Sequence, residues 1–212
     1  YNGDILFIYA VCGVLIIPLI RASNKVIIAV IILMLLQPVE LVYLIMGLID
    51  PSTPILDLGS AGCYNAILAA QSEGSILDVA RDGLVYGLPA NFLWAIENGR
   101  MTQTILFFLM GIMLGRWRLF YDEGDNLKIW KKVLIGSVIA FAVLLPIFLT
   151  VPKAVEIKCV SNSLNVALNM WKNLAMMMFI VSGTTLLYYK TSAKSWMMKI
   201  APYGKMSLTN YL

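Results

Sequence analysis

The sequence predicts an all-α fold, a polytopic bundle of transmembrane helices. Hydrophobic residues make up 60% of the 212 residues and charged residues only 13%, and the mean hydropathy is +0.81. A soluble domain has about 50% apolar and about 25% charged residues, so the composition excludes that class. The apolar runs are continuous, and several approach the roughly 20 residues that cross a bilayer as a helix. They lack the alternation of apolar and polar residues that a membrane β-barrel would show.

About five helices are predicted to cross the membrane, and a sixth is predicted to begin near Ser207. The five cover Ile5–Ile20, Val26–Ile49, Gln103–Leu114, Val133–Val151 and Val166–Tyr189. The third run is short, so we expect its helix to continue through Tyr121, with Arg116 and Arg118 reaching toward the lipid headgroups. Trp130 lies near a predicted helix end, as in the aromatic belt of a membrane protein.

Residues 50–102 form the one long connection between these helices. Within it, the stretch SILDVARDGLVYGL places Ile76, Val79, Ala80 and Leu84 on one face of a helix. This outer amphipathic segment would lie on the membrane surface, cap the bundle or cover a binding site as a lid. Residues 1–212 as a whole are expected to form a single membrane domain. Because an apolar segment starts near Tyr1 and another is cut at Leu212, we expect this domain to be an excerpt of a larger protein.

The positive charges predict the orientation in the membrane. Eleven of the 16 Lys and Arg residues fall in one set of alternate loops, around residues 21–25, 116–132 and 190–205. Short cytoplasmic loops keep positive charge more readily than translocated ones, so these loops are predicted to be cytoplasmic and Tyr1 extracytoplasmic. The chain is thus expected in the cell membrane, as a multi-pass protein in contact with the lipid bilayer. Its net charge of +4 follows from this topology and gives no reason to expect a nucleic acid partner.

Four blocks of the sequence resemble a known family. They are NGDILFIYAVCGVLIIPL, SEGSILDVARDG, FFLMGIMLGRWRLF and GKMSLTNYL, and in order and spacing they are similar to the DUF418 membrane proteins, also called YeiB-like. The resemblance covers nearly the whole chain and implies the carboxy-terminal part of such a protein, with amino-terminal helices of the same protein as further partners. In GKMS, Lys205 stands where many relatives have Arg, which keeps the charge but loses a bidentate contact.

The resemblance also implies a function. The family is grouped by distant similarity with membrane acyltransferases, which pass acyl groups from a cytoplasmic donor to an acceptor on the far side. An acyl-CoA donor is therefore implied, and no other cofactor is evident. The chain has no His, so it cannot build a Ser–His or Cys–His pair by itself, and the base of such an enzyme is expected outside these residues. Cys12, Cys63 and Cys159 are too far apart for zinc-binding spacing, so no metal site is predicted.

Glu40 is the strongest catalytic candidate, because it interrupts an apolar run together with Gln37 and Pro38. Pro38 removes a helix hydrogen bond and should kink the helix. A charged group at this depth costs at least about 2.5 kcal/mol unless it meets a partner or water. We therefore expect Glu40 to face the bundle interior; if the apolar span ended before it, it would be a boundary residue instead. Candidate partners from other helices are Tyr9, Ser182 and Thr184.

Four other residues are site candidates. Asp4 is the second catalytic candidate, with an N-cap of the first helix as the alternative role. Arg100, at the outer mouth of the third helix, would bind an anionic acceptor, pair with Glu97 or stay solvated. Lys205 and Asn210 are candidates for substrate binding in the polar stretch that ends the chain. Arg116 and Arg118 would anchor the inner interface or meet a donor phosphate.

Three functions stay open at this point. The first is acyl transfer to an extracytoplasmic acceptor, which rests on the family resemblance. The second is a transporter or permeation protein with an intramembrane acidic residue, because a kinked helix with an acid at depth is common in ion or proton coupling. The third is a structural membrane subunit, which needs none of these charges.

Overall fold

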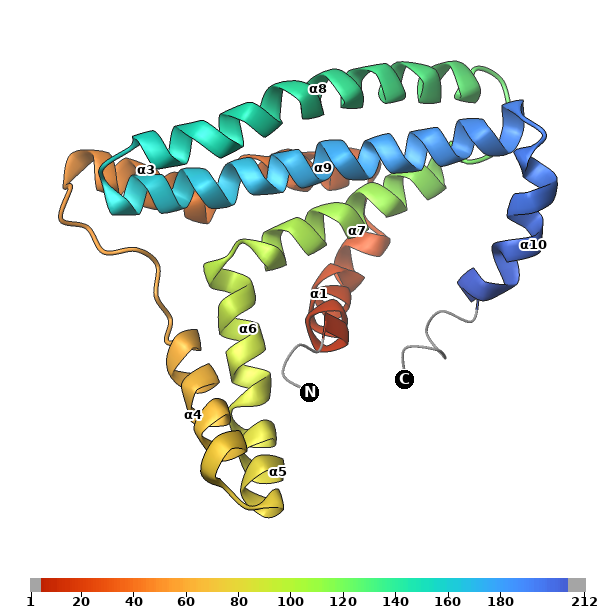
Figure 1. Ribbon diagram of the computed structural model, residues 1–212. Coiled ribbons are helices and arrows are strands. Elements are labelled where there is room, and N and C mark those ends of the chain that lie inside the picture. Colours follow the sequence, from red (N-terminus) through yellow and green to blue (C-terminus); the bar gives the residue numbers. More distant parts are fainter. Residues whose placement is uncertain (1–4, 206–212) are drawn as a thin grey trace. The chain divides into compact units, whose positions relative to one another are not determined.

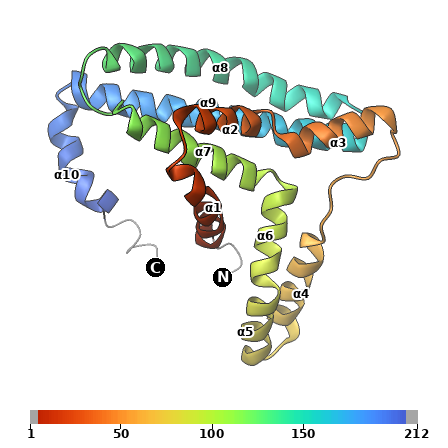
Figure 2. The same ribbon diagram turned by 180° about the vertical axis from the view of Figure 1, so that it is seen from behind.

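The structure is a computed structural model that describes residues 5–205, and this part of the chain is all-α (Figures 1 and 2). The helices in chain order are α1 (Ile5–Ile20), α2 (Asn24–Leu35), α3 (Pro38–Ile49), α4 (Ser60–Glu73), α5 (Ile76–Val85), α6 (Gly87–Glu97), α7 (Arg100–Arg116), α8 (Asn126–Ala154), α9 (Lys158–Lys190) and α10 (Ala193–Lys205).

Within residues 5–205, three stretches are long and apolar enough to cross a membrane, as expected for a multi-pass membrane protein. They are Asn24–Ile49, Asn126–Ala154 and Lys158–Lys190. The last two contain the predicted spans Val133–Val151 and Val166–Tyr189 and extend both. The predicted helix Ile5–Ile20 forms as α1, which is apolar but shorter than the three long stretches.

The predicted kink in the second span is a complete break between two helices. α2 ends at Leu35, and Gln37 adopts a left-handed conformation with φ 49° and ψ 71° before α3 begins at Pro38. Proline is suited to the first turn of a helix because its missing N–H would have no partner there anyway. Pro38 therefore starts α3 rather than bending one continuous helix.

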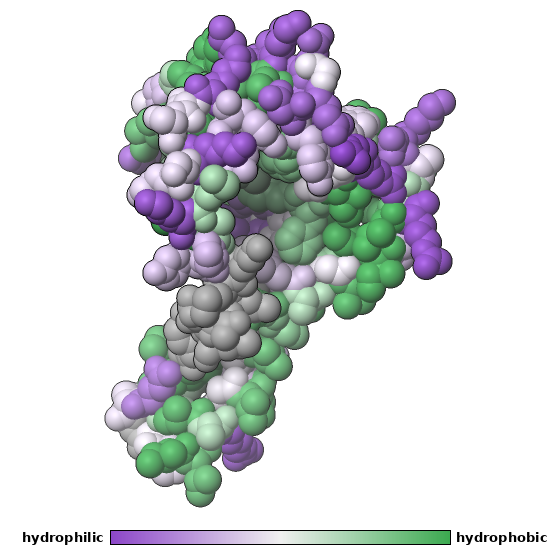
Figure 3. Space-filling view, turned by 90° about the vertical axis from the view of Figure 1, so that its right-hand side faces the viewer, coloured by the Kyte–Doolittle hydropathy of each residue, from purple (hydrophilic) through white to green (hydrophobic). Residues whose placement is uncertain are grey.

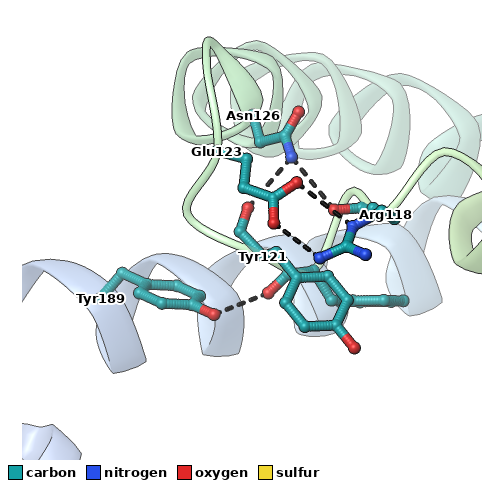
Figure 4. Close-up of polar contacts among 6 residues, drawn as sticks. Arg118, Tyr121, Glu123, Asn126 and Tyr189 are labelled. Atoms are coloured by element: carbon teal, nitrogen blue, oxygen red, sulfur yellow. Dashed lines mark hydrogen bonds and ion pairs between the residues drawn. The ribbon is translucent and has the colours of Figure 1, made fainter.

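The predicted extension of the third helix through Tyr121 is wrong. α7 ends at Arg116, and Arg118 has a φ of 53°, which no regular helix accommodates. The turn after α7 is held by side chains: Arg118 forms an ion pair with Glu123, with Nη2 at 2.7 Å from Oε1, and Asn126 donates to the carbonyl oxygens of Arg118 and Tyr121 (Figure 4). Local hydrogen bonds thus outweigh the apolar character of residues 117–121.

Trp130 packs into this turn. The prediction that it lies in an exposed aromatic belt is therefore wrong. Its side chain is 1% exposed, stacks on Phe120 and donates from Nε1 to the carbonyl oxygen of Leu119 at 2.6 Å. Tyr189, near the end of α9, donates to the carbonyl oxygen of Phe120 at 2.8 Å (Figure 4). The turn is therefore fixed from both α8 and α9.

The long connection holds three helices where the sequence predicted one. α4 packs against α5 and α6, and the hydroxyl of Tyr64 on α4 donates to Asn91 Oδ1 on α6 at 2.8 Å. α5 is the predicted amphipathic helix. It starts with a capping box in which Ser75 Oγ accepts from the N–H of Asp78, while the Asp78 carboxylate accepts from the N–H of Ser75. The Ser75 hydroxyl also donates to Asp78 Oδ2 at 2.7 Å, and this bond, followed by the bond from the Ser75 N–H, holds the pKa of Asp78 below its ordinary value.

The chain divides into two compact units. The first comprises Tyr1–Met113 with Ile147–Trp171, and the second comprises Leu114–Pro146 with Lys172–Leu212. In the first unit, one buried apolar cluster joins Ile16, Ile27 and Leu109, which belong to α1, α2 and α7. The second unit is rich in exposed positive charge, and Figure 3 shows hydrophilic residues gathered over the upper part of the face that it views. The exposed lysines of this unit are Lys128, Lys131, Lys132, Lys190, Lys194 and Lys199.

Candidate functional site

The break between α2 and α3 is held in place by the first half of α9, beside which α3 runs in both Figures 1 and 2. Gln37 is 1% exposed, and its Nε2 donates to the carbonyl oxygen of Ala167 at 3.0 Å. Trp171 donates from Nε1 to the carbonyl oxygen of Leu35 at 3.0 Å. Breaking a helix leaves backbone carbonyls without partners, and in hydrocarbon such groups must be satisfied by neighbouring protein. The two bonds therefore stabilise the break between α2 and α3.

Glu40 faces the interior of the first unit, as predicted. It lies in the first turn of α3, and only 6% of it is exposed. Within residues 5–205, neither Glu40 Oε2 nor Gln37 Oε1 has a hydrogen-bond partner. Buried polar atoms are rarely left in this state, because each unpaired group costs about 1–3 kcal/mol. Two unsatisfied acceptors three residues apart mark this break as a candidate binding site.

Gly99 lets the corner between α6 and α7 approach Glu40 closely. Its φ is 62°, and a Cβ added there would lie 2.9 Å from Glu40 Oε1 and 2.7 Å from Val166 Cγ1. Both distances are shorter than ordinary contacts, and L side chains disfavour this backbone conformation. Only glycine fits this position without displacing Glu40 or α9.

A small cavity lies beside Glu40. Its volume is about 10 Å³, which is room for one water-sized particle. Its polar lining includes the side chains of two acids, Glu40 and Glu97, and of Asn162 and Ser163 from α9. The other residues that line it are Val39, Tyr43, Leu56 and Val166.

Glu97 caps α4 and forms no ion pair with Arg100, which was one of the alternatives left open for that arginine. Its Oε1 accepts from the N–H of Leu58 at 2.6 Å and from the N–H of Ser60 at 3.2 Å, and its Oε2 accepts a short hydrogen bond from the Ser60 hydroxyl. These donors lie at the positive N-terminal end of α4 and stabilise a carboxylate there. The contact joins the end of α6 to the start of α4.

The predicted partners of Glu40 have other roles. Tyr9 packs edge-on against Phe108, with ring centroids 5.7 Å apart. Ser182 donates to the carbonyl oxygen of Met178 at 2.6 Å, and Thr184 donates to carbonyl oxygens of its own helix. Hydroxyl groups on helices commonly bond back to the preceding turn in this way. The burial of Glu40 is therefore confirmed, but within residues 5–205 none of these three residues bonds to its Oε2.

Arg100 lines a separate and larger pocket of about 430 Å³ in the same unit. Its Nη1 donates to Gln103 Oε1 at 3.0 Å, and its guanidinium carbon lies 6.0 Å from the centroid of the Trp94 ring. Within the described ranges, no carboxylate lies within 4.0 Å of this guanidinium. The rest of the pocket wall is mostly apolar and consists of Ile8, Tyr9, Thr104 and Phe107. A mainly apolar pocket with one cation and one amide can hold a small amphiphilic anion.

The remaining candidates divide between described and undescribed residues. Asp4 and Asn210 lie outside the described residues, and Lys205 is the last residue of α10. Arg118, the alternative phosphate ligand, contacts Glu123 with both Nε and Nη2. This bidentate pair raises the pKa of Arg118 and occupies the donors that a phosphate would need.

No metal ligand set forms in the part of the chain that the structure describes. Residues 5–205 hold no group of three or more Cys, Asp or Glu side chains placed to bind a metal ion. The thiols of Cys12, Cys63 and Cys159 are all free.

Sequence reasoning missed Glu97 and Gly99 as neighbours of Glu40. The sequence ENGR does carry a signal for the glycine, because Gly is common just after a helix end in a left-handed conformation. Nothing local indicates that this corner meets α3, since residues 40 and 99 lie far apart in the chain. The role of Glu97 as a cap for α4 was hidden for the same reason.

Comparison with known proteins identifies part of the chain. No curated protein and no solved structure matches it. Residues 114–212 match the model of the family described as "Protein of unknown function (DUF418)", which confirms over this part of the chain the family predicted from its sequence.

Proposed function

We propose that this protein transfers acyl groups across the cell membrane, from a cytoplasmic acyl-CoA donor to an extracytoplasmic acceptor held in the Arg100 pocket. Five crossings, with Tyr1 on the outside and a sixth helix near Ser207, would place this pocket toward the outer face. Residues 1–212 act as one membrane domain, with residues 50–102 as the outer connection. The observation that carries the proposal is the pocket of about 430 Å³ with a guanidinium at its wall.

Arg100 binds the anionic group of the acceptor. It is the first residue of α7, so the positive end of that helix adds to its charge. Trp94, Tyr9 and Phe107 supply apolar surface for the rest of the acceptor. The pocket volume lies within the range of about 300–1,000 Å³ that is usual for small-molecule sites.

The reaction would consist of a single exchange of bonds. A hydroxyl or amine of the acceptor attacks the thioester carbonyl, the new C–O or C–N bond forms, and the C–S bond breaks. Coenzyme A leaves as the thiol and carries the proton that the acceptor loses. Arg100 positions the acceptor in this scheme and does not act as the base.

Proteoliposomes that contain the protein and labelled acetyl-CoA test this proposal. Label is expected on an acceptor in the wild type, and Arg100→Gln should raise the KM for that acceptor at least about tenfold, as loss of a charge-assisted hydrogen bond of about 1.5–3 kcal/mol would. Arg81→Gln, at an exposed position of α5, is the matched control and should leave KM unchanged. No transferred label in the wild type would refute acyl transfer, and equal KM values in the two variants would refute the role of Arg100.

A second candidate function is transport or permeation. The observation that favours it is the break between α2 and α3, with unsatisfied acceptors at Gln37 and Glu40. Broken helices that expose polar groups near the middle of the bilayer hold ions and substrates in many transporters. A structural membrane subunit, the third candidate, would need neither the break nor these acceptors.

A further inference from the structure

We infer that the cavity beside Glu40 binds one small monovalent cation of the size of Na⁺. The inference goes beyond acyl transfer and does not depend on it. It rests on the charge, the size and the oxygen lining of this one cavity.

Within the described part of the chain, the negative charge of Glu40 beside the cavity has no positive partner to balance it. Glu40 is 94% buried, because only 6% of it is exposed, and its Oε2 accepts no hydrogen bond within residues 5–205. Over the same residues, no Lys or Arg nitrogen lies within 4.0 Å of its carboxylate. A buried carboxylate that is ionised needs a positive partner, since burial of an isolated charge is very costly.

Glu97 adds a second carboxylate but not a second uncompensated charge. Its oxygens already accept three hydrogen bonds from Leu58 and Ser60 at the start of α4. The helix terminus therefore offsets the charge of Glu97, and Glu40 alone remains to be balanced. One remaining negative charge calls for one monovalent cation.

The size of the cavity supports the same ligand. A volume of about 10 Å³ holds a single water-sized particle and excludes organic cations. Mg²⁺ keeps several waters in an octahedral shell and Ca²⁺ takes 6–8 oxygen ligands, and this cavity has no room for such waters. Asn162 and Ser163, whose side chains carry neutral oxygens, line the cavity together with Glu40 and Glu97.

Gly99 lies against Glu40 and Val166, two of the residues that line this cavity. Because Gly99 has no side chain, its backbone can lie close to Glu40. A Cβ at this position would lie only 2.9 Å from Glu40 Oε1. A side chain at position 99 would therefore displace Glu40, which lines the cavity.

Thermal unfolding of the purified protein tests the inference, with NaCl replaced by choline chloride at constant ionic strength. A ligand that binds only the folded state stabilises it in proportion to the logarithm of its concentration. The Tm of the wild type should rise by about 3–5 °C for each tenfold increase in Na⁺ above the dissociation constant. K⁺, which is larger, should give a smaller rise, and choline none.

Glu40→Gln should abolish the Na⁺-dependent rise, because it keeps the shape of the side chain but removes its charge. Glu156→Gln, at an exposed position between α8 and α9, is the matched control and should keep the full rise. Asn162→Ala removes a neutral oxygen and should shift the rise in Tm to higher Na⁺ concentrations. It provides the test if Glu40→Gln does not fold.

Equilibrium binding of radioactive Na⁺ gives the second readout, with one ion per chain expected. An unchanged Tm over all Na⁺ concentrations, or the same rise in Glu40→Gln as in the wild type, would overturn the inference and leave water as the occupant. Dependence on pH without dependence on Na⁺ would overturn it in favour of a proton. Because acyl transfer is read from label on the acceptor, either proposal can fail without the other.

Discussion

Gln37 Nε2 donates to the carbonyl oxygen of Ala167 at 3.0 Å, and this bond joins the break between α2 and α3 to the first half of α9. The residues are 130 positions apart in the sequence. The bond satisfies a side-chain donor that would otherwise be buried without a partner. It also holds Gln37 in its left-handed conformation, with φ at 49°.

Loss of this bond should destabilise the protein. Gln37→Ala removes the donor to Ala167 and is expected to lower the free energy of unfolding by about 1–3 kcal/mol. Gln71→Ala, at an exposed position of α4, is the control and should change it by less than about 0.5 kcal/mol. Chemical unfolding in detergent measures both. Equal effects of the two substitutions would show that the bond contributes nothing.

Gly99→Ala should lower the stability of the protein by more than its strained backbone conformation alone explains. Gly124 offers the comparison, because its φ of 52° is similar to the 62° of Gly99 but a Cβ there meets nothing within 4 Å. Gly124→Ala should therefore cost only the conformational strain, about 1–2 kcal/mol. Gly99→Ala adds the collision with Glu40 and Val166 and should lower the Tm further. A smaller loss for Gly99→Ala than for Gly124→Ala would contradict the close approach.

Trp130 should be the tryptophan whose removal costs most in the second unit. Trp130→Ala deletes a side chain that is 1% exposed and is expected to cost about 3–5 kcal/mol. Trp196→Ala removes a side chain that is 64% exposed and should cost little. Thermal unfolding in detergent compares the two variants. A loss at Trp196 as large as that at Trp130 would argue against the packed turn.

Cysteine labelling from outside intact cells tests the proposed orientation. Cys63→Ala supplies the background, because the other two native thiols are buried. Asn65→Cys, exposed on α4, should react with a membrane-impermeant maleimide, and Asp122→Cys in the turn after α7 should react only after the cells are opened. Ser60 is a poor site for such a label, because it is 5% exposed and bonded to Glu97. Reaction of Asp122→Cys in intact cells would reverse the topology.

The cap of α5 should weaken in acid. The pKa of Asp78 is lowered in the folded state, so its contribution is present above the ordinary Asp pKa and is lost as the pH falls through the lower, folded value. Hydrogen exchange of the amides at the start of α5, corrected for the intrinsic effect of pH, should speed up over that interval. Ser75→Ala removes the main cause of the shift and should flatten the response. A wild type with no such acceleration would contradict the capping box.

Much of the fold could be predicted where the apolar pattern acts alone. α1, α8 and α9 follow from continuous apolar runs, and Pro38 indicated a disturbance in the second span. α4 and α6 were missed because their apolar residues do not gather on one face strongly enough to stand out from a loop. The turn at Arg118 was misread because its geometry depends on hydrogen bonds with Glu123 and Asn126.

The candidate site could be predicted only in part. An acid in an apolar span is costly wherever it lies, so Glu40 could be singled out, and its burial followed from that cost. What it meets depends on α6, α7 and α9, which approach it from positions up to 126 residues away, at Val166. No local pattern encodes such neighbours, and Glu97 and Gly99 therefore emerged only from the structure.

The bond between Gln37 and Ala167 has a consequence for biosynthesis. A ribosome adds about 5–20 residues per second, so the 130 residues that separate these partners take roughly 6–26 s to make. During that interval the nascent segment around Gln37 and Glu40 has entered the insertion machinery without the helix that satisfies it. Its polar groups must meanwhile be sheltered by the insertion channel, a chaperone or water at the membrane surface. The stretch Asn24–Ile49 therefore cannot reach its final state on its own, and its release into lipid should await the emergence of α9.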